Sequence, residues 1–226
     1  MPNWLRLMVA EAVGTFFLVF PGVAAPMLGK SVPLLDIALA NGLGLAIGIS
    51  ATLAVSGGAL NPAVTITLWA LGKLKTGLAV LYIIAELVGA TIAALLLLWM
   101  IPGGHVAMGT PTPAPGISAL DAAGLECVMT FLLVSAVLNT IVDRQAPKIA
   151  GLAVGLIVVA DVLAGGPLTG AAMNPARAFG PELVSGVWSG AWAYWVGPIA
   201  GGLLAGLIYR FFLQSADAPV ATTAGK

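Results

Sequence analysis

The sequence predicts an all-α integral membrane protein with six transmembrane helices and two re-entrant half-helices, arranged as an inverted repeat. Three observations support this prediction. The 226 residues are 60% hydrophobic and only 8% charged, whereas about a quarter of the residues in soluble domains are charged. Six apolar stretches are long enough to cross a bilayer, and the tripeptide Asn-Pro-Ala occurs twice within apolar sequence. An ordinary soluble domain is therefore excluded.

The six apolar stretches approach or exceed the roughly 20 residues that a helix needs to cross a bilayer. The first contains Glu11 and has no small-residue cleavage site before Pro21, so we expect an uncleaved span rather than a signal peptide. The predicted spans are residues 5–27, 33–55, 77–101, 119–142, 149–164 and 188–213.

Both tripeptides predict helix starts, because Asn caps helices well and Pro favours the first helical position. They consist of Asn61, Pro62 and Ala63, and of Asn174, Pro175 and Ala176. The apolar runs after them, 63–71 and 176–184, are about ten residues each, which is roughly 15 Å of helix. That is half of a hydrocarbon core of about 30 Å. Two such helices entering from opposite faces would meet tip to tip at the midplane.

The two halves of the chain repeat each other. The pattern Glu-x-x-x-Thr-Phe at Glu11 recurs at Glu126, and a tyrosine pattern at Tyr82 recurs at Tyr194. With the two tripeptides, these give offsets of 115, 113 and 112 residues. Each half holds three spans, an odd number, so the second half enters the membrane in the opposite sense. We expect a first repeat at 1–101, an inter-repeat loop at 102–118, a second repeat at 119–213 and a cytoplasmic tail at 214–226.

The positions of lysine and arginine predict the orientation, because cytoplasmic loops carry an excess of these residues. With a cytoplasmic N-terminus only Lys30 lies in an outer loop, and Arg177 falls in the second re-entrant region. We therefore expect a multi-pass protein of the cell membrane, plasma or inner, with both termini in the cytoplasm. The basic residues that then lie inside are Arg6, Lys73, Lys75, Arg144, Lys148, Arg210 and Lys226.

Composition also narrows the partners and cofactors. The formal net charge is zero, and no basic run is interleaved with aromatic residues, so we expect no nucleic-acid partner. The chain has one cysteine, Cys127, and one histidine, His105. We expect neither a metal site nor another cofactor. No Ser–His pair and no paired catalytic aspartates lie at membrane depth, which disfavours an intramembrane enzyme.

Two strings around the tripeptides, SGGALNPAVT at 56–65 and GPLTGAAMNPARAFGP at 166–181, point to one family. With Arg177 after the second tripeptide and a Glu in the first span of each repeat, the chain resembles the aquaporins and aquaglyceroporins, the major intrinsic proteins. The resemblance spans essentially all six predicted helices. It implies a right-handed bundle, a homotetramer with one pore per subunit, and a passive channel rather than an enzyme. The partners would be water, small uncharged solutes and the lipid bilayer.

Helix electrostatics agrees with what the family implies. Two helix N-termini that meet at the midplane place their positive dipole ends at the narrow centre. Asn61 and Asn174 can each offer an amide N–H to a passing oxygen. A permeating water then donates its hydrogens away from the centre, which interrupts a proton wire. We expect neutral solutes to pass and protons and ions to be excluded.

By resemblance to family members, the selectivity filter consists of Asn41, Val162, Ala171 and Arg177. Water-selective members usually have an aromatic residue and a His at the first two positions, where this chain has Asn and Val. A lone intramembrane arginine costs about 2.5–3.5 kcal/mol, so Arg177 should face water or buried carbonyls. The smaller side chains predict a filter wide enough for glycerol-sized neutral solutes as well as water.

The sequence signals for the solute are mixed, so alternatives stay open. The string before the second tripeptide resembles the glycerol facilitators, but Ala178 and Glu182 stand where those channels typically have Asp and a basic residue. The Tyr194-Trp195 pair is aquaporin-like. The chain could instead be a strict water channel, or a channel mainly for hydrogen peroxide, urea, ammonia or a neutral metalloid acid.

The intramembrane carboxylates also admit two interpretations, because a charge there is costly unless it is hydrogen-bonded internally. By resemblance, Glu11 and Glu126 each support the backbone of a re-entrant loop. The rival interpretation is a proton-coupling group in an ion-gradient-coupled secondary transporter, a class that also uses inverted repeats and broken helices. Glu86 and Asp161 are less expected in the family. They either bond a neighbouring helix or subunit, or gate or tune the pore.

Overall fold

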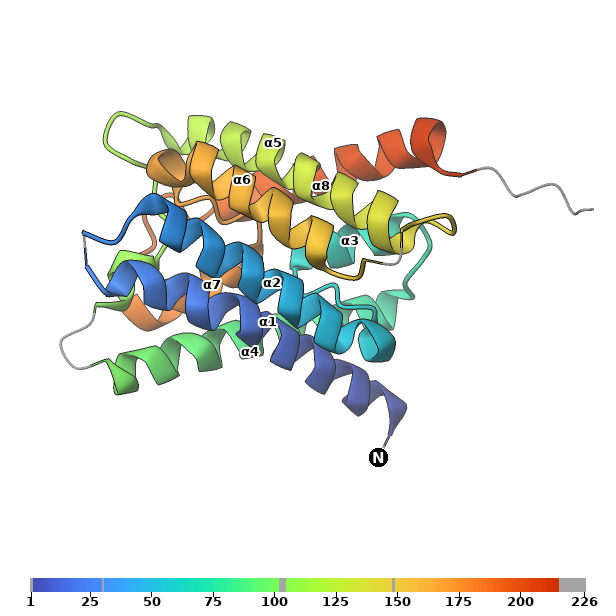
Figure 1. Ribbon diagram of the computed structural model, residues 1–226, viewed down its shortest axis with the longest axis horizontal. Coiled ribbons are helices and arrows are strands. Elements are labelled where there is room, and N and C mark those ends of the chain that lie inside the picture. The colour runs from blue at the N-terminus through green and yellow to red at the C-terminus, as the bar shows by residue number, and fades with distance from the viewer. Residues whose placement is uncertain (1, 30, 102–104, 148, 216–226) are drawn as a thin grey trace, which may run out of the picture.

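The computed structural model describes residues 2–29, 31–101, 105–147 and 149–215. Over these ranges the secondary structure is entirely helical, as predicted, and six helices are long and apolar enough to span a membrane. The six spans lie side by side along the long axis (Figure 1) and are α1 (Asn3–Met27), α2 (Leu34–Ser56), α4 (Thr76–Met100), α5 (Ala119–Val137), α6 (Leu152–Thr169) and α8 (Ala193–Ile208). Both α5 and α8 continue as a π-helical turn, Leu138–Val142 and Tyr209–Leu213.

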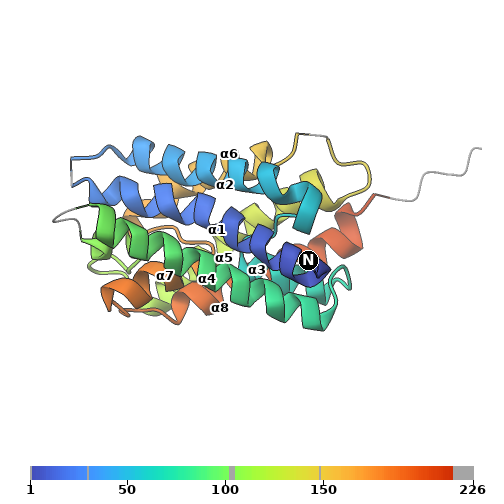
Figure 2. The ribbon, with the colours of Figure 1, turned by 90° about the horizontal axis from the view of Figure 1, so that it is seen from below.

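Two short helices, α3 (Pro62–Ala70) and α7 (Pro175–Ser185), begin at the prolines of the two tripeptides, as the sequence predicts. They approach the middle of the molecule from opposite ends (Figures 1 and 2). A 3-10 turn, Val106–Gly109, lies in the loop between the repeats. The N-terminal ends of the half-helices therefore lie inside the bundle formed by the six spans, where Ala63 and Ala176 are fully buried.

Two of the predicted span boundaries are wrong. The fifth span continues past residue 164, through Pro167 to Thr169, and ends where Gly170 adopts a left-handed φ of 83°. A proline so close to a helix end removes few hydrogen bonds, and glycine supplies the left-handed C-cap. The sixth span begins at Ala193 rather than at residue 188, because Gly190, with a φ of 70°, lies in a turn that precedes it.

The repeat shows in how the first and third helices of each half pack. A Cβ built on Gly89 of α4 would lie 2.2 Å from the carbonyl oxygen of Ala12 in α1. In the second half, a Cβ on Gly201 of α8 would lie 2.0 Å from the carbonyl oxygen of Cys127 in α5. Only glycine permits such close approach of two backbones. Equivalent glycines thus hold equivalent helix pairs together in the two repeats.

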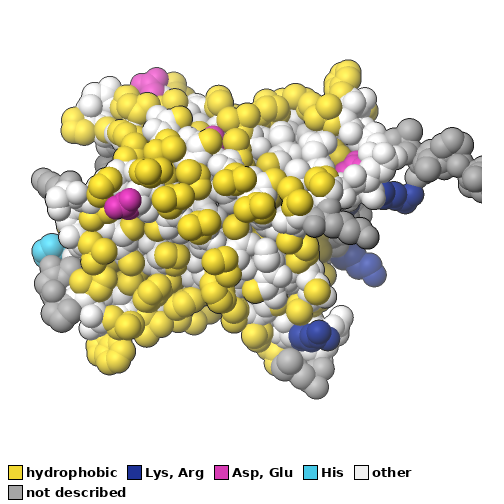
Figure 3. Space-filling model, viewed as in Figure 1, with side chains coloured by type: hydrophobic (Ala, Val, Ile, Leu, Met, Phe, Trp, Pro, Cys, Tyr) yellow, Lys and Arg dark blue, Asp and Glu magenta, His cyan; other side chains and the backbone are white. Residues whose placement is uncertain are grey.

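The surface suits a lipid environment. Hydrophobic side chains cover the middle of the face seen in Figure 3, and the dark blue lysine and arginine side chains gather at one end of it. The first helix starts and the last helix ends at that same end (Figure 1). Of the basic residues used to predict orientation, Lys30, Lys148 and Lys226 lie outside the described residues, as does the predicted tail beyond residue 215.

Candidate functional site

The asparagine of each tripeptide caps its own half-helix. The Asn61 side-chain oxygen accepts a hydrogen bond from the Ala63 N–H at 2.9 Å. The Asn174 oxygen accepts from the N–H groups of Ala176 at 2.9 Å and Arg177 at 3.2 Å. Each cap satisfies amide groups that a helix start leaves unpaired. The side-chain oxygen therefore points into the helix and the amide nitrogen points away from it.

The amide nitrogens join the two repeats. Asn61 Nδ2 donates to the Met173 carbonyl oxygen and Asn174 Nδ2 donates to the Leu60 carbonyl oxygen, both at 2.9 Å. An amide carries two N–H donors, so each asparagine keeps a second one for another acceptor. Leu60 and Met173 both have a φ of 52°, a left-handed conformation that is costly for a non-glycine residue. The surrounding hydrogen bonds hold this strained backbone in place.

Glu11 of α1 supports the first re-entrant loop. Its two carboxylate oxygens accept from the N–H groups of Ala59 at 3.2 Å and Leu60 at 2.7 Å. The side chain is fully buried. A buried carboxyl group tolerates this position because backbone donors replace its hydration. The left-handed Leu60 is thus bonded at its N–H by Glu11 and at its carbonyl by Asn174.

Glu126 of α5 has the equivalent position in the second repeat. Its oxygens accept from the N–H groups of Ala172 at 2.9 Å and Met173 at 2.6 Å, and from the Thr169 hydroxyl at 2.7 Å. Thr169 in turn accepts from the Ala171 N–H at 3.1 Å. Glu126 therefore holds the second loop in the way that Glu11 holds the first.

Two tyrosines hold the residues at which α2 and α6 end, a role that the sequence did not reveal. Tyr82 donates its hydroxyl to the Ser56 carbonyl oxygen, and Tyr194 donates to that of Thr169, both at 2.7 Å. The repeat pattern marked these two tyrosines as equivalent. Their partners could have been sought at the equivalent ends of the preceding spans.

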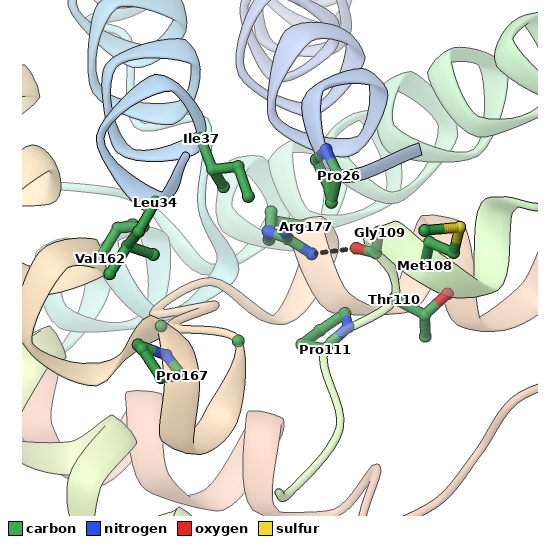
Figure 4. Close-up of a pocket in the computed structure, with 12 residues that line it drawn as sticks. Pro26, Leu34, Ile37, Met108, Gly109, Thr110, Pro111, Val162, Pro167 and Arg177 are labelled. Carbon is green, nitrogen blue, oxygen red and sulfur yellow. Dashed lines mark hydrogen bonds between the residues drawn. The ribbon is translucent and has the colours of Figure 1, made fainter. Parts of the chain in front are cut away.

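Arg177 is 4% exposed and lies at the boundary of two cavities. Its Nη1 donates to the Gly109 carbonyl oxygen at 2.9 Å (Figure 4). Gly109 belongs to the inter-repeat segment, which sequence reasoning treated as a linker. The segment is therefore also part of the site, and no motif in it signals the contact.

The site consists of an outer vestibule and a constriction. The vestibule has a volume of about 270 Å³, and Val162 lies in its wall beside Leu34 (Figure 4). The constriction has a volume of only about 10 Å³. Its lining includes Asn41, Ala171 and Arg177 together with Asn61 and Asn174. Three of the four predicted filter residues thus meet both tripeptide asparagines, and Val162 lies further out.

The amide of Asn41 is fixed by its own helix, because Nδ2 donates to the Ile37 carbonyl oxygen at 2.8 Å. The side chain is 3% exposed. Among the described residues that line the two cavities, none carries an aromatic ring or an imidazole. The two cavities are therefore lined by aliphatic, thioether and amide side chains, one threonine and one guanidinium.

The remaining buried carboxyl groups lie outside the cavity linings. Glu86 accepts from the Thr65 hydroxyl at 2.6 Å, which joins α4 to α3. Asp161 and Glu182 are 3% and 1% exposed, and Asp161 Oδ2 and both Glu182 oxygens have no hydrogen-bond partner among the described residues. Within the described ranges no group of three or more His, Cys, Asp and Glu residues is placed to hold a metal ion.

Comparisons with known proteins agree on one family. A family model described as major intrinsic protein matches residues 1–209. Aquaporin TIP4-4 of Zea mays is 45% identical, over 96% of this chain and 90% of that protein. The probable aquaporin TIP3-2 of Arabidopsis thaliana is 42% identical, over 94% and 85%. The crystal structure of the aquaglyceroporin from Plasmodium falciparum superposes with a TM-score of 0.82 at 26% identity, covering 93% of this chain and 97% of that one.

Proposed function

The chain belongs to the major intrinsic protein family, whose members are channels rather than enzymes, and from that premise we propose that it passes water and glycerol-sized neutral solutes while excluding protons and ions. It is a multi-pass membrane protein and a channel for water and small solutes. The width of its filter, its exclusion of protons, its orientation and its assembly are the proposed parts.

One observation favours the wide filter: the constriction lacks ring side chains among its described lining residues. Asn41 and Ala171, at two positions that family resemblance assigns to the filter, line the constriction, and both side chains are smaller than a ring. Selectivity among neutral solutes depends on pore diameter and on the hydrogen-bonding groups that line it. Amide and guanidinium donors beside aliphatic walls suit a polyol, whose hydroxyls lie along one side of a carbon chain.

The arrangement at the centre supports proton exclusion. The N-termini of α3 and α7 meet there, and each carries a partial positive charge. Asn61 and Asn174 each keep one amide N–H that can bind the oxygen of a water molecule. A water so held cannot accept a proton from one side and pass another onward. The charge of Arg177 adds a further barrier to cations at the constriction.

A strict water channel is the second candidate, and the constriction's volume favours it. About 10 Å³ is close to the minimum that holds one water molecule. Glycerol would pass only if lining side chains such as Leu133 or Met173 move as it enters. The strict water channel and the glycerol-permeable channel therefore differ in whether the side chains that line the constriction move aside for a carbon chain.

The distribution of charge supports a cytoplasmic location for both termini. The dark blue basic side chains visible in Figure 3 lie at the end where the chain begins and α8 ends, and such an excess is typical of cytoplasmic loops. We place the protein in the cell membrane, plasma or inner. Fusing a cytoplasmic-only reporter to each terminus in turn tests this orientation.

Family resemblance supports a homotetramer with one pore in each subunit. A hollow of about 640 Å³ between α1 and α2, lined by Phe17, Leu39 and Leu43, leaves apolar surface for a second copy. Mass measurement of the detergent-solubilised protein tests this assembly. A monomeric mass with full water flux would contradict it.

Stopped-flow swelling of proteoliposomes tests the solute. Water and glycerol permeability should both exceed those of empty liposomes, and neither should change with a pH or sodium gradient across the membrane. Asn41→Trp serves as the blocked control, because an indole would fill the constriction. Fast water flux without glycerol flux would instead support the strict water channel. Saturable flux that requires an ion gradient would point to a secondary transporter.

A further inference from the structure

Asn41 of α2 lies against a glycine of α1. A Cβ built on Gly22 would come within 2.3 Å of Asn41 Oδ1 and 2.9 Å of its Cγ, well inside the roughly 3.5 Å at which nonbonded heavy atoms are relaxed. The nitrogen of the same amide is bonded to the Ile37 carbonyl oxygen at 2.8 Å. Asn41 therefore occupies a recess that exists only because residue 22 has no side chain.

The backbone of α2 has no room to move away from this recess. Toward α1, a Cβ on Gly44 would lie 2.6 Å from the Phe17 carbonyl oxygen. Toward α6, a Cβ on Gly42 would lie 2.5 Å from the Gly155 carbonyl oxygen. Two neighbouring helices thus press directly on α2. Pressure from residue 22 must therefore be relieved by the Asn41 side chain rather than by the helix.

The free direction for that side chain is the lumen. Asn41 lines the constriction together with Ala171 of the second re-entrant loop and Arg177 of α7. The constriction measures only about 10 Å³, roughly the space of one water molecule. Moving the amide by about 1 Å to restore van der Waals contact would remove much of this space.

We propose that Gly22 determines the solute size limit of the channel by giving Asn41 a recess outside the lumen. The filter's width then depends on a residue of α1 that lines neither cavity, as well as on the residues at its surface. The inference rests on the proposed channel function, because the effect is read as permeation. Gly22 is a positioning residue that acts through Asn41.

Gly22→Ala tests the proposal in proteoliposomes, with permeability normalised to the amount of protein. The added methyl pushes Asn41 inward, so glycerol permeability should fall at least about fivefold, and more than water permeability falls, because a narrower pore penalises the larger solute most. Gly77→Ala is the matched control. It makes the same substitution near the start of α4, where a Cβ would meet nothing within 4 Å, and should leave both permeabilities unchanged.

The double variant Gly22→Ala/Asn41→Ala decides whether the effect passes through Asn41. Alanine at position 41 lacks the atoms that the new methyl would strike. The double variant should therefore match Asn41→Ala alone in both permeabilities. A glycerol loss from Gly22→Ala that persists in the Asn41→Ala background would overturn the proposal, as would unchanged glycerol permeability in the single variant.

Two further outcomes are also decisive. If Gly22→Ala alone fails to accumulate as folded protein and the added Asn41→Ala restores folding, the predicted clash between residue 22 and Asn41 is supported. If the double variant also fails to accumulate, that clash is refuted. If the wild-type protein excludes glycerol, the proposal that glycerol is a solute is wrong. The proposed role of Gly22 can still be tested by measuring water permeability. Water permeability should then fall in Gly22→Ala and recover in the double variant.

Discussion

The side-chain nitrogen of Asn61 donates to the main-chain carbonyl oxygen of Met173 at 2.9 Å across 112 residues of sequence. The reciprocal bond joins Asn174 to Leu60. Each asparagine thus caps its own half-helix with its oxygen and holds the opposite loop with its nitrogen. The positions of the two half-helices are coupled through these four residues.

Removing one of these side chains should destabilise both repeats. Asn61→Ala loses the helix cap and leaves the Met173 carbonyl without its donor, at a cost of roughly 2–4 kcal/mol. Thermal unfolding in detergent should show a clearly lower midpoint, with reduced water permeability. Asn139→Ala is the control, because that amide bonds the Ser135 carbonyl within its own helix segment. Equal losses in the two variants would contradict the coupling.

Replacing the carboxylate of the second repeat should weaken its loop. Glu126→Gln exchanges an acceptor oxygen for an NH₂ group that faces other donors, and an unsatisfied buried group costs about 1–3 kcal/mol. Glu86→Gln is the matched comparison, because the amide oxygen can still accept a hydrogen bond from the Thr65 hydroxyl. Unfolding midpoints should therefore fall further for Glu126→Gln. The opposite order would show that loop support is not its main role.

Arg177→Val should relax selectivity. The substitution removes a positive charge from the lining of the constriction and the bond to the Gly109 carbonyl. We expect glycerol permeability to rise and a proton leak to appear. If the free-energy barrier to proton passage falls by about 1.4 kcal/mol, the proton leak becomes about tenfold faster. A pH-sensitive dye inside the vesicles, under an imposed membrane potential, measures the leak. Lys73→Gln, in the turn that follows α3, is the control. If the proton leak of Arg177→Val equals that of the wild-type protein, proton exclusion depends on the half-helices alone.

The contacts of Asp143 near the end of α8 offer a pH prediction. The hydroxyl of Ser215 donates to Asp143 at 2.5 Å, its N–H donates at 3.0 Å, and the Gln145 N–H donates at 2.9 Å. These bonds, with one from the Tyr209 hydroxyl at 3.0 Å, hold the pKa of Asp143 well below its usual range. A depressed folded-state pKa stabilises the fold above the ordinary carboxyl pKa of about 3.9, and this stability is lost as pH falls through the lower folded value.

Hydrogen-exchange protection of residues 209–215, corrected for intrinsic rates, should therefore stay constant from about pH 8 to about pH 5 and fall below that. Asp143→Asn should lower it throughout that range, because the amide accepts fewer hydrogen bonds. Asp121→Asn, which alters a capping box with Ser118 in the first turn of α5, should leave it unchanged. Protection that already declines between pH 7 and pH 5 would show that another group controls this contact.

Local patterns in the sequence predicted most of the architecture. Apolar length determines which segments can cross a bilayer, and the Asn-Pro pair at positions 61–62 and 174–175 determines where the half-helices begin, because capping and proline preference act within one turn. Span ends were less well predicted. Pro167 did not end α6, and the position of its end depended on the left-handed Gly170.

The amino-acid sequence by itself thus determined the number of spans, the two half-helices and the inverted repeat, since each follows from neighbouring residues or from repetition. Only the tertiary structure decided which distant groups meet: Gly109 with Arg177, Tyr194 with Thr169, and Gly22 with Asn41. These contacts depend on the angle and depth at which helices pack. No residue spacing along the chain encodes either quantity.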